Sequence, residues 1–261
     1  MPTYAVLGAT GKTGSAILEI LSRKPDNKIH AFVRSASKLK KQWPKLVDSG
    51  HLQIFEGQLD DTSILANCLD GTRAAFLCIA ATINEPYCTI AQDTATSVIK
   101  ACSNLRDSNK PNSIPRLVQL NSSSTSPKLS ESLGTIGHAI LYRGNWWIYE
   151  DLIASENLFR AQCSWLDVTY IKPGGLIQAP QKGHKLSTER QQTFLGWLDL
   201  AAGMVEVAEE ESEVWRGREV SVLPVAEDVP IEWRVPIWMV MGFVLTYFPW
   251  VYAPAKRVGL L

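Results

Sequence analysis

The first residues whose types and spacing suit chemistry are three glycines, Gly8, Gly11 and Gly14, near the start of the chain. They follow a short apolar run at 4–7 and precede a stretch with helical periodicity at 15–21. A strand, a glycine turn and a helix in this order can bind a dinucleotide, because the backbone can approach the pyrophosphate and the helix start offers free N–H groups. The alternative is a glycine turn without a ligand, and the flanking elements favour the nucleotide site.

A second pattern suited to binding lies at the end of the next apolar run, at 28–34. Arg34 stands there, with Ser35 and Lys38 close by and no acidic residue. In nucleotide folds an acidic residue at this place binds the ribose 2′-hydroxyl, whereas an arginine suits a 2′-phosphate. The pattern therefore favours NADP(H) over NAD(H). The alternative is a solvated basic loop, because lysines continue as far as Lys45.

Hydroxyl side chains gather after a third apolar run, at 116–120. The run leads directly into Asn121 and five consecutive Ser or Thr residues at 122–126. Open α/β sheets bind ligands at the carboxyl ends of their strands, so this segment is a candidate substrate site. Five hydroxyls cannot all be functional, and we expect one or two of Ser122, Ser123 and Ser124 to act.

Apolar runs alternate with helical patterns along most of the chain. This alternation is typical of βαβ units and predicts an α/β protein with a Rossmann, doubly wound parallel sheet. The run at 73–80 is almost continuously apolar, as expected for a central strand, and the small Ala80 at its end would let a cofactor pass. We expect a NAD(P)-binding Rossmann domain at 1–180 and a small C-terminal substrate cap at 181–261.

The C-terminal stretch 235–255 contains no charged residue and many aromatic ones. Pro236 and Pro249 would bound a helix of about 18 Å, which is shorter than the ~30 Å hydrocarbon core of a membrane. We expect the stretch to form a wall of an apolar substrate pocket or a homodimer surface. Peripheral membrane contact is the second interpretation and a true span the third.

Composition excludes several other classes of function. The chain has 261 residues, of which 46% are hydrophobic, and 26 basic residues balance 26 acidic ones. The balanced charge argues against a nucleic-acid partner. The five cysteines lack CxxC spacing, and no secretory signal is apparent, so we expect reduced, buried thiols in a cytoplasmic protein. The four histidines are scattered, and no metal site is predicted.

Six motifs in a fixed order carry a family resemblance. Over about residues 1–180 the chain resembles the atypical short-chain dehydrogenases/reductases of the NmrA-like group, and within it the averufin-oxidase-like enzymes of fungal aromatic polyketide pathways. The motifs are the glycine turn at 8–14, Val33-Arg34, Glu56-Gly57-Gln58-Leu59-Asp60, Asn121-Ser122-Ser123-Ser124, Tyr149-Glu150-Asp151-Leu152 with Glu156, and Ile171-Lys172-Pro173-Gly174-Gly175.

The resemblance implies how NADP(H) is held. Arg34 would bind the 2′-phosphate, and Pro173 would begin a backbone break at which the chain again approaches the ligand. Gln58 and Leu59 would lie beside the adenine, where the family has Gly-Asp-Leu; Gln58 can still accept a hydrogen bond from the exocyclic amine. The residues implied in the glycine turn are Gly8, Thr10, Gly11, Lys12, Thr13 and Gly14.

The catalytic helix departs from the family pattern. Short-chain dehydrogenases combine a serine and a tyrosine with a lysine four residues after the tyrosine, and here Ile153 follows Tyr149 at that spacing. Without the cation, Tyr149 would be a general acid or hydrogen-bond donor more readily than a base. Lys172 could supply a charge from another direction. Further candidates for proton transfer are His138 and Tyr142, and Ser123 or Ser124 would bind the substrate oxygen.

These observations predict an NADP(H)-dependent oxidoreductase acting on a flat aromatic polyketide of the anthraquinone or xanthone type, with Trp146 and Trp147 stacking on its rings. Two alternatives remain open. One is a redox-neutral isomerase or dehydratase on the same scaffold. The other is a non-catalytic, NmrA-like regulator that senses dinucleotides, which the missing lysine would favour.

Overall fold

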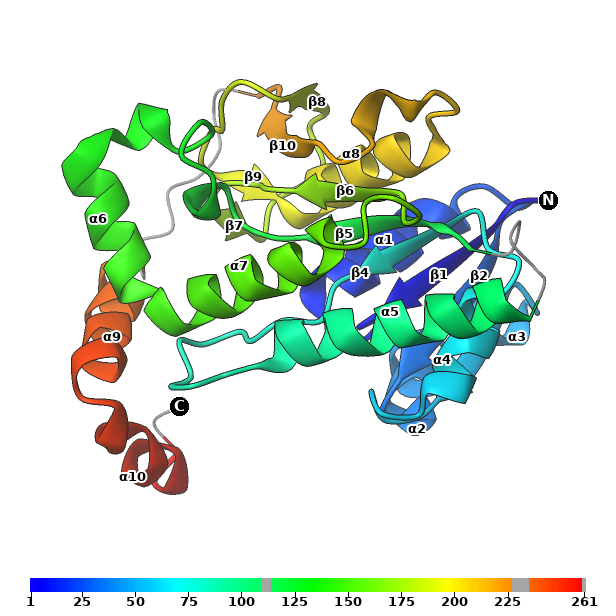
Figure 1. Ribbon diagram of the computed structural model, residues 1–261, viewed down its shortest axis with the longest axis horizontal. Helices are drawn as coiled ribbons and strands as arrows, with labels where there is room; N and C mark the ends of the chain where they lie inside the picture. Colours follow the sequence, from blue (N-terminus) through cyan, green and yellow to red (C-terminus); the bar gives the residue numbers. More distant parts are fainter. Residues whose placement is uncertain (109–113, 227–234, 260–261) are drawn as a thin grey trace.

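The protein is built on an eight-stranded sheet flanked by helices on both faces, in a computed structural model that describes residues 1–108, 114–226 and 235–259 (Figure 1). All neighbouring strands run parallel except the last pair, in which β8 is antiparallel to β10. The predicted Rossmann architecture is confirmed. The strands, in their order across the sheet, are β3 (Leu52–Glu56), β2 (Lys28–Val33), β1 (Thr3–Leu7), β4 (Ala74–Leu77), β5 (Arg116–Leu120), β6 (Val168–Ile171), β10 (Glu219–Pro224) and β8 (His184–Ser187).

Apolar side chains bury the sheet from both sides. One core layer contains Ile17 and Leu21 with Leu200 and Met204, and the other contains Val98 and residues that face it. Their spacing of three or four residues places each set on one face of its helix. The helices of the first layer are α1 (Lys12–Ser22) and α8 (Trp197–Glu209), and those of the second are α4 (Thr62–Leu69), α5 (Ile90–Asp107) and α7 (Trp146–Arg160).

The chain order places a crevice at the carboxyl edge of the sheet. From β1 the chain winds outward to β2 and β3, with α2 (Ala36–Gln42) and α3 (Pro44–Asp48) between them, and then returns to β4 on the other side of β1. Leu7 at the end of β1 pairs with both Phe32 and Leu77. The connections therefore diverge at β1 and β4, and ligands of doubly wound sheets bind at such a switch point.

The region after residue 180 differs from the predicted cap. β10 continues the main sheet through the pairing of Val220 with Ile171, β8 adds the antiparallel edge, and α8 packs on α1. The polar stretch that contains β8 has little strand character of its own, and pairing with β10 supplies its hydrogen bonds. Two short strands, β7 (Leu176–Ile177) and β9 (Leu195–Gly196), form a separate parallel pair. A substrate-binding role for 181–261 stays a prediction.

The apolar C-terminal segment consists of α9 (Val235–Tyr247), η5 (Pro249–Val251) and α10 (Tyr252–Arg257). Its first helix, α9, packs against helix α6 (Gly134–Gly144) (Figure 1). Gly242 and Gly144 touch, and Asn84 donates to the Gly242 carbonyl oxygen and the Thr246 hydroxyl. In the described ranges no helix alone is long and apolar enough to span a membrane; α9 with the following helical turns passes that test only as a pair bent by 109°. Whether this segment meets a membrane, a second copy or the substrate stays a prediction.

The sequence predicts that the cysteines are buried, but not all of them are. Cys68 and Cys102 are buried, but Cys163 is exposed. Burial raises the pKa of the Cys102 thiol to about 12. Cys163 lies in the short turn after α7, where no apolar periodicity could indicate its exposure. The prediction of burial is confirmed for Cys68 and Cys102 and wrong for Cys163, while Cys78 and Cys88 are half-buried.

Candidate functional site

The glycine turn connects β1 to α1 at the switch point. Gly8 has a φ of +82°, and a Cβ on it would lie 2.7 Å from the carbonyl oxygen of Cys78 at the end of β4. A Cβ on Gly14 would collide with the Gly8 carbonyl oxygen. The turn is closed by a hydrogen bond of 2.9 Å from the Gly11 N–H to that same oxygen. Only glycine fits at Gly8 and Gly14 without rearrangement.

The start of α1 leaves N–H groups available to an anion. Gly11 is the N-cap and provides no side-chain hydrogen bond, and the helix has eleven residues. Thr13 is buried in the first turn, Thr10 is half-buried, and Lys12 is exposed with its Nζ 5.6 Å from the ring of Trp197. A helix start that has no side-chain cap and that follows a glycine turn fits the pyrophosphate of a dinucleotide.

Arg34 lies at the tip of β2, exposed and, within the described residues, without a hydrogen bond or ion pair. Ser35 caps α2 by accepting a hydrogen bond of 3.4 Å from the Lys38 N–H, so its hydroxyl is already used. An unpaired guanidinium at this place fits a 2′-phosphate. Lys38 is exposed one turn further along the helix.

The remaining predicted cofactor residues follow the neighbouring strands. Gln58 is exposed after β3, and its N–H donates to Asp61 Oδ2 at 2.7 Å, while Leu59 is half-buried against the core. Ala80 is half-buried and lies three residues after the end of β4, because β4 ends earlier than the predicted strand at 73–80. Pro173 is buried after β6. All of these positions lie at the carboxyl edge of the sheet, and their contacts to a cofactor stay predictions.

Residues 121–126, which we name the serine turn, lie at the same edge after β5. Asn121 organises the turn, because its Oδ1 accepts from the Ser122 N–H at 2.8 Å and from the Thr125 hydroxyl at 3.0 Å. Ser123 and Ser124 are buried, and their hydroxyls have no hydrogen-bond partner among the residues that the structure describes. Both hydroxyls are therefore unpaired within the described residues, and their contact with a ligand stays a prediction.

Tyr149 lies on α7, and its side chain packs against α6. Its ring centroid lies 5.5 Å from that of Tyr142, and its hydroxyl has no partner in the described part of the chain. The Tyr142 hydroxyl donates to Glu150 at 2.8 Å, and burial together with this carboxylate raises the pKa of Tyr142. Tyr149 thus keeps a free hydroxyl, whereas that of Tyr142 is occupied.

Helix α7 is fixed by a buried carboxylate that the sequence analysis noted only as part of the family motif. Asp151 accepts hydrogen bonds from the N–H groups of Ala91 at 2.8 Å and Gln92 at 3.0 Å, which are the first turn of α5. A carboxylate at a helix start satisfies donors that have no partner within the helix. This contact holds the register of the helix that carries Tyr149.

A shallow hollow of about 290 Å³ adjoins the serine turn. It is lined mainly by His138, Tyr142, Arg143 and Trp146, on α6 and the start of α7. The Nε2 atom of His138 lies 2.8 Å from the carbonyl oxygen of Ser124, so the hollow and the turn are in direct contact. The Arg143 guanidinium lies 4.7 Å from the centre of the Trp146 ring. Flat aromatic rings can stack on such a surface.

Trp147 does not line this hollow. Its indole N–H donates to the Leu245 carbonyl oxygen at 3.2 Å, and its ring packs on Tyr87 at 4.3 Å. Trp147 therefore attaches α7 to the C-terminal segment. Of the two tryptophans predicted to stack on a substrate, only Trp146 borders the hollow.

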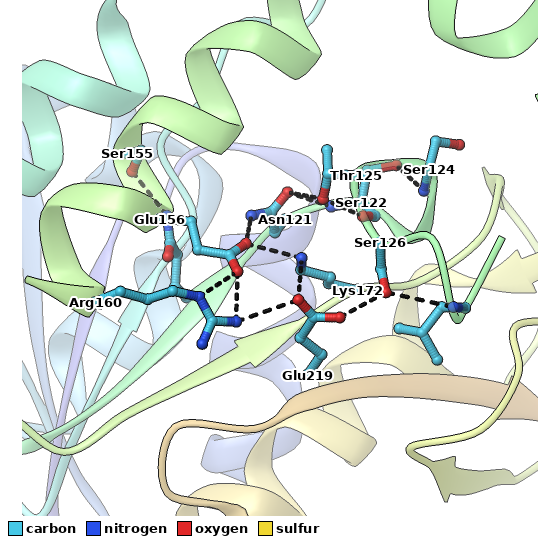
Figure 2. A network of polar contacts seen from close by, with 12 residues as sticks. Asn121, Ser122, Ser124, Thr125, Ser126, Ser155, Glu156, Arg160, Lys172 and Glu219 are labelled. Atoms are coloured by element: carbon cyan, nitrogen blue, oxygen red, sulfur yellow. Dashed lines mark hydrogen bonds and ion pairs between the residues drawn. The ribbon is translucent and has the colours of Figure 1, made fainter. Parts of the chain in front are cut away.

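Lys172 lies in a buried ionic network beneath the serine turn (Figure 2). Its side chain is only 1% exposed, and its Nζ lies 2.8 Å from Glu156 and 2.9 Å from Glu219. Arg160 contacts the same two carboxylates, at 2.6 and 3.2 Å. Both carboxylates engage the lysine, and its expected role as a source of positive charge for the reaction stays a prediction.

Two members of this network were not singled out from the sequence. Arg160 follows Glu156 by four residues, and this spacing could have indicated their ion pair. Glu219 carries no such signal, because it meets Lys172 only through the pairing of β10 with β6. Glu156 was noted only as part of the family motif.

Comparisons with known proteins agree with this geometry. A family model described as NAD(P)H-binding matches residues 8–211. The chain is 38% identical to "Oxidoreductase aflX" of Aspergillus parasiticus, over 97% of this chain and 94% of that protein. It is 40% identical to "Oxidoreductase ordB" of Dothistroma septosporum, with the same coverage, and 41% identical to "Oxidoreductase stcQ" of Emericella nidulans, over 97% of this chain and 93% of that protein.

Among solved structures, the chain resembles a short-chain dehydrogenase/reductase from Veillonella parvula in complex with NADP. The TM-score is 0.64 at 14% identity, with 86% of this chain and 95% of that chain covered. At this level of identity the likeness concerns the fold.

Proposed function

The chain belongs to the NAD(P)H-binding family and is an NAD(P)-dependent oxidoreductase, and from this premise we propose that it transfers hydride between NADP(H) and a flat aromatic polyketide of the anthraquinone or xanthone type. The observation that carries the substrate class is the aromatic hollow beside the serine turn. The resemblance to averufin-oxidase-like enzymes supports the same class.

The chain's own groups suit the binding of NADP(H). The glycine turn and the uncapped N–H groups of α1 would hold the pyrophosphate, and the unpaired Arg34 would hold the 2′-phosphate. When bound, NADPH supplies the hydride. An arginine rather than an acidic residue at the tip of β2 is what favours the phosphorylated cofactor.

Reduction of a carbonyl group also needs a proton at oxygen. Tyr149 has a free hydroxyl that can donate this proton, while Ser123 or Ser124 can donate a hydrogen bond to the same oxygen. Ile153 gives Tyr149 no cation at the usual spacing. These roles suit Tyr149 as an acid, and therefore reduction of the substrate rather than its oxidation.

The hollow would receive the rest of the substrate. Trp146 and His138 provide ring faces, and Arg143 provides a cation at the rim. A polyketide with several fused rings buries apolar area on such a surface, and its phenolic groups can meet the guanidinium. In this proposal the glycine turn would hold the cofactor, and the hollow would select the substrate.

The test is to mix the purified chain with NADPH and a series of hydroxyanthraquinones and hydroxyxanthones, following absorbance at the nicotinamide band. We expect substrate-dependent oxidation of NADPH, and Trp146→Ala to raise KM by about tenfold through the lost stacking. Trp43→Ala, on the α2–α3 side of the sheet, is the matched control. Product formed without NADPH oxidation would instead identify a redox-neutral enzyme, and tight NADPH binding without any product would identify a regulator.

A further inference from the structure

Two carboxylates hold the two ends of the serine turn (Figure 2). Glu156 on α7 accepts a hydrogen bond of 2.8 Å from the Asn121 side-chain amide, at the first residue of the turn. Glu219 on β10 accepts one of 2.5 Å from the Ser126 hydroxyl, at the last. Ser123 and Ser124 lie between these two attachment points, and their hydroxyls stay unpaired within the described residues.

A single buried cation joins the two carboxylates. The Lys172 ammonium group lies within 3 Å of both, so it fixes the distance between the ends of the turn. Lys172 belongs to the segment that follows β6, and the carbonyl oxygen of the next residue, Pro173, accepts a hydrogen bond of 2.9 Å from the Ser123 N–H. One short segment thus supports the turn at its ends through the ammonium group and at its middle through the backbone.

The same contacts relate the turn to Tyr149. Glu156 follows Tyr149 by seven residues on α7, which is two helical turns, so both side chains point to the same side of the helix. The contact between Asn121 and Glu156 therefore sets where the turn lies along the helix that carries the free tyrosine hydroxyl.

We propose that Lys172, Glu156 and Glu219 form a clamp that positions the Ser123 and Ser124 hydroxyls against Tyr149, so that the three groups can meet one substrate oxygen. This inference rests on the proposed function for the identity of that oxygen. The clamp residues are positioning residues, because they act through the turn and none of them needs to touch the substrate. A buried ion pair contributes little net stability compared with an apolar substitute, and fixed geometry is its better-attested role.

The first experiment replaces the shared cation. In Lys172→Met we expect kcat to fall about 10²-fold, the loss that a displacement of about 1 Å in a reacting group can cause. The dissociation constant for NADPH, measured by nucleotide fluorescence, should not change, because the glycine turn lies on another strand. Hydrogen–deuterium exchange of the amides in 121–126 should become faster.

The matched control is Arg116→Met. Arg116 lies at the opposite end of β5 and pairs with Asp167 at 2.8 Å, so its loss removes a partly buried ion pair from the same strand without touching the turn. We expect a lower melting temperature but wild-type kcat and wild-type exchange in 121–126. If both variants change kcat and exchange alike, the network is only a support of the fold and the clamp is refuted.

Lys172→Met leaves two buried carboxylates without their shared cation, which endangers folding, so a second variant keeps all four ionic groups. Asn121→Asp retains the acceptor used inside the turn but puts a carboxylate oxygen against Glu156. We expect kcat to be low at neutral pH and to recover as the pH falls, since a shared proton can rebuild the contact. Lys172, Arg160 and Glu219 face this pair and would shift the midpoint. Wild-type kcat at every pH would refute the clamp.

The failure of the clamp and the failure of the proposed function are distinguishable. If the wild-type chain oxidises no NADPH with any polycyclic phenol, the proposed function is wrong, and amide exchange in 121–126 still decides whether Lys172 holds the turn. If the wild-type chain is active but exchange in Lys172→Met is unchanged, the clamp is wrong and the proposed function stands.

Discussion

The glycine turn and the serine turn both follow a parallel strand at the carboxyl edge of the sheet, but they are held in different ways. The glycine turn is shaped by its own backbone, through the hydrogen bond from Gly11 to Gly8 and the space that Gly14 leaves free. The serine turn is held by side chains from α7 and β10, which lie 35 and 93 residues away in the sequence. A phosphate site can thus be encoded locally, whereas this candidate substrate site depends on contacts between distant elements.

The largest effect is expected in the glycine turn. In Gly14→Ala the added Cβ would collide with the Gly8 carbonyl oxygen, which is backbone and cannot move aside. We expect NADPH affinity to fall by about 10²-fold or more, because the helix start can no longer approach the phosphates. Isothermal titration with NADPH measures this. Gly137→Ala on α6, where the nearest atom is 3.9 Å from the new Cβ, should bind normally.

A large effect on turnover alone is expected beside the serine turn. Tyr149→Phe removes the free hydroxyl and should lower kcat by about 10²-fold, as is typical for the loss of a general acid, while NADPH affinity stays unchanged. Steady-state kinetics with a hydroxyanthraquinone test this. Tyr252→Phe in α10 is the control. Unchanged turnover in Tyr149→Phe would show that Tyr149 is not the proton donor, and the serine turn would then act without it.

A smaller and cofactor-specific effect is expected at β2. Arg34→Ala should raise KM for NADPH by about tenfold, because one charge-assisted contact to the 2′-phosphate is lost, and should leave KM for NADH unchanged. Lys38→Ala, on the exposed face of α2, should change either value little. Equal losses for both cofactors would show that Arg34 does not read the 2′-phosphate.

The smallest effect concerns the pH dependence of stability. Burial opposes ionisation of Glu219, but the hydrogen bonds from Ser126 and Lys172, with the charges of Lys172 and Arg160, outweigh it and lower the pKa of this carboxyl. Its contribution to stability is therefore complete above the ordinary value of 4.5 and is lost as the pH falls through the lowered folded-state pKa. Glu219→Gln should lower the melting temperature by about 2 °C at neutral pH, with a smaller difference at pH 3. Thermal melts at several pH values measure this.

The fold was largely predictable because its first six parallel strands carry their own signal. The run at 116–120 coincides with β5, and the run at 73–80 contains β4, since a strand in the middle of a parallel sheet is buried along its length. The elements after residue 180 were less predictable. β8 is polar and gains its strand conformation from β10, and the predicted boundary at 180 therefore does not separate the sheet from the rest.

The sequence by itself determined the glycine turn, the basic tip of β2 and the hydroxyls after β5. Each of these features depends only on the types of a few residues that are close together in the sequence. Only the tertiary structure decided which of these side chains are free. It left the hydroxyls of Ser123, Ser124 and Tyr149 unpaired within the described residues and enclosed Lys172 between two carboxylates. The physical reason is that burial and pairing of a charge depend on elements that meet only when the sheet forms, and Glu219 reaches Lys172 only across the β6–β10 pairing.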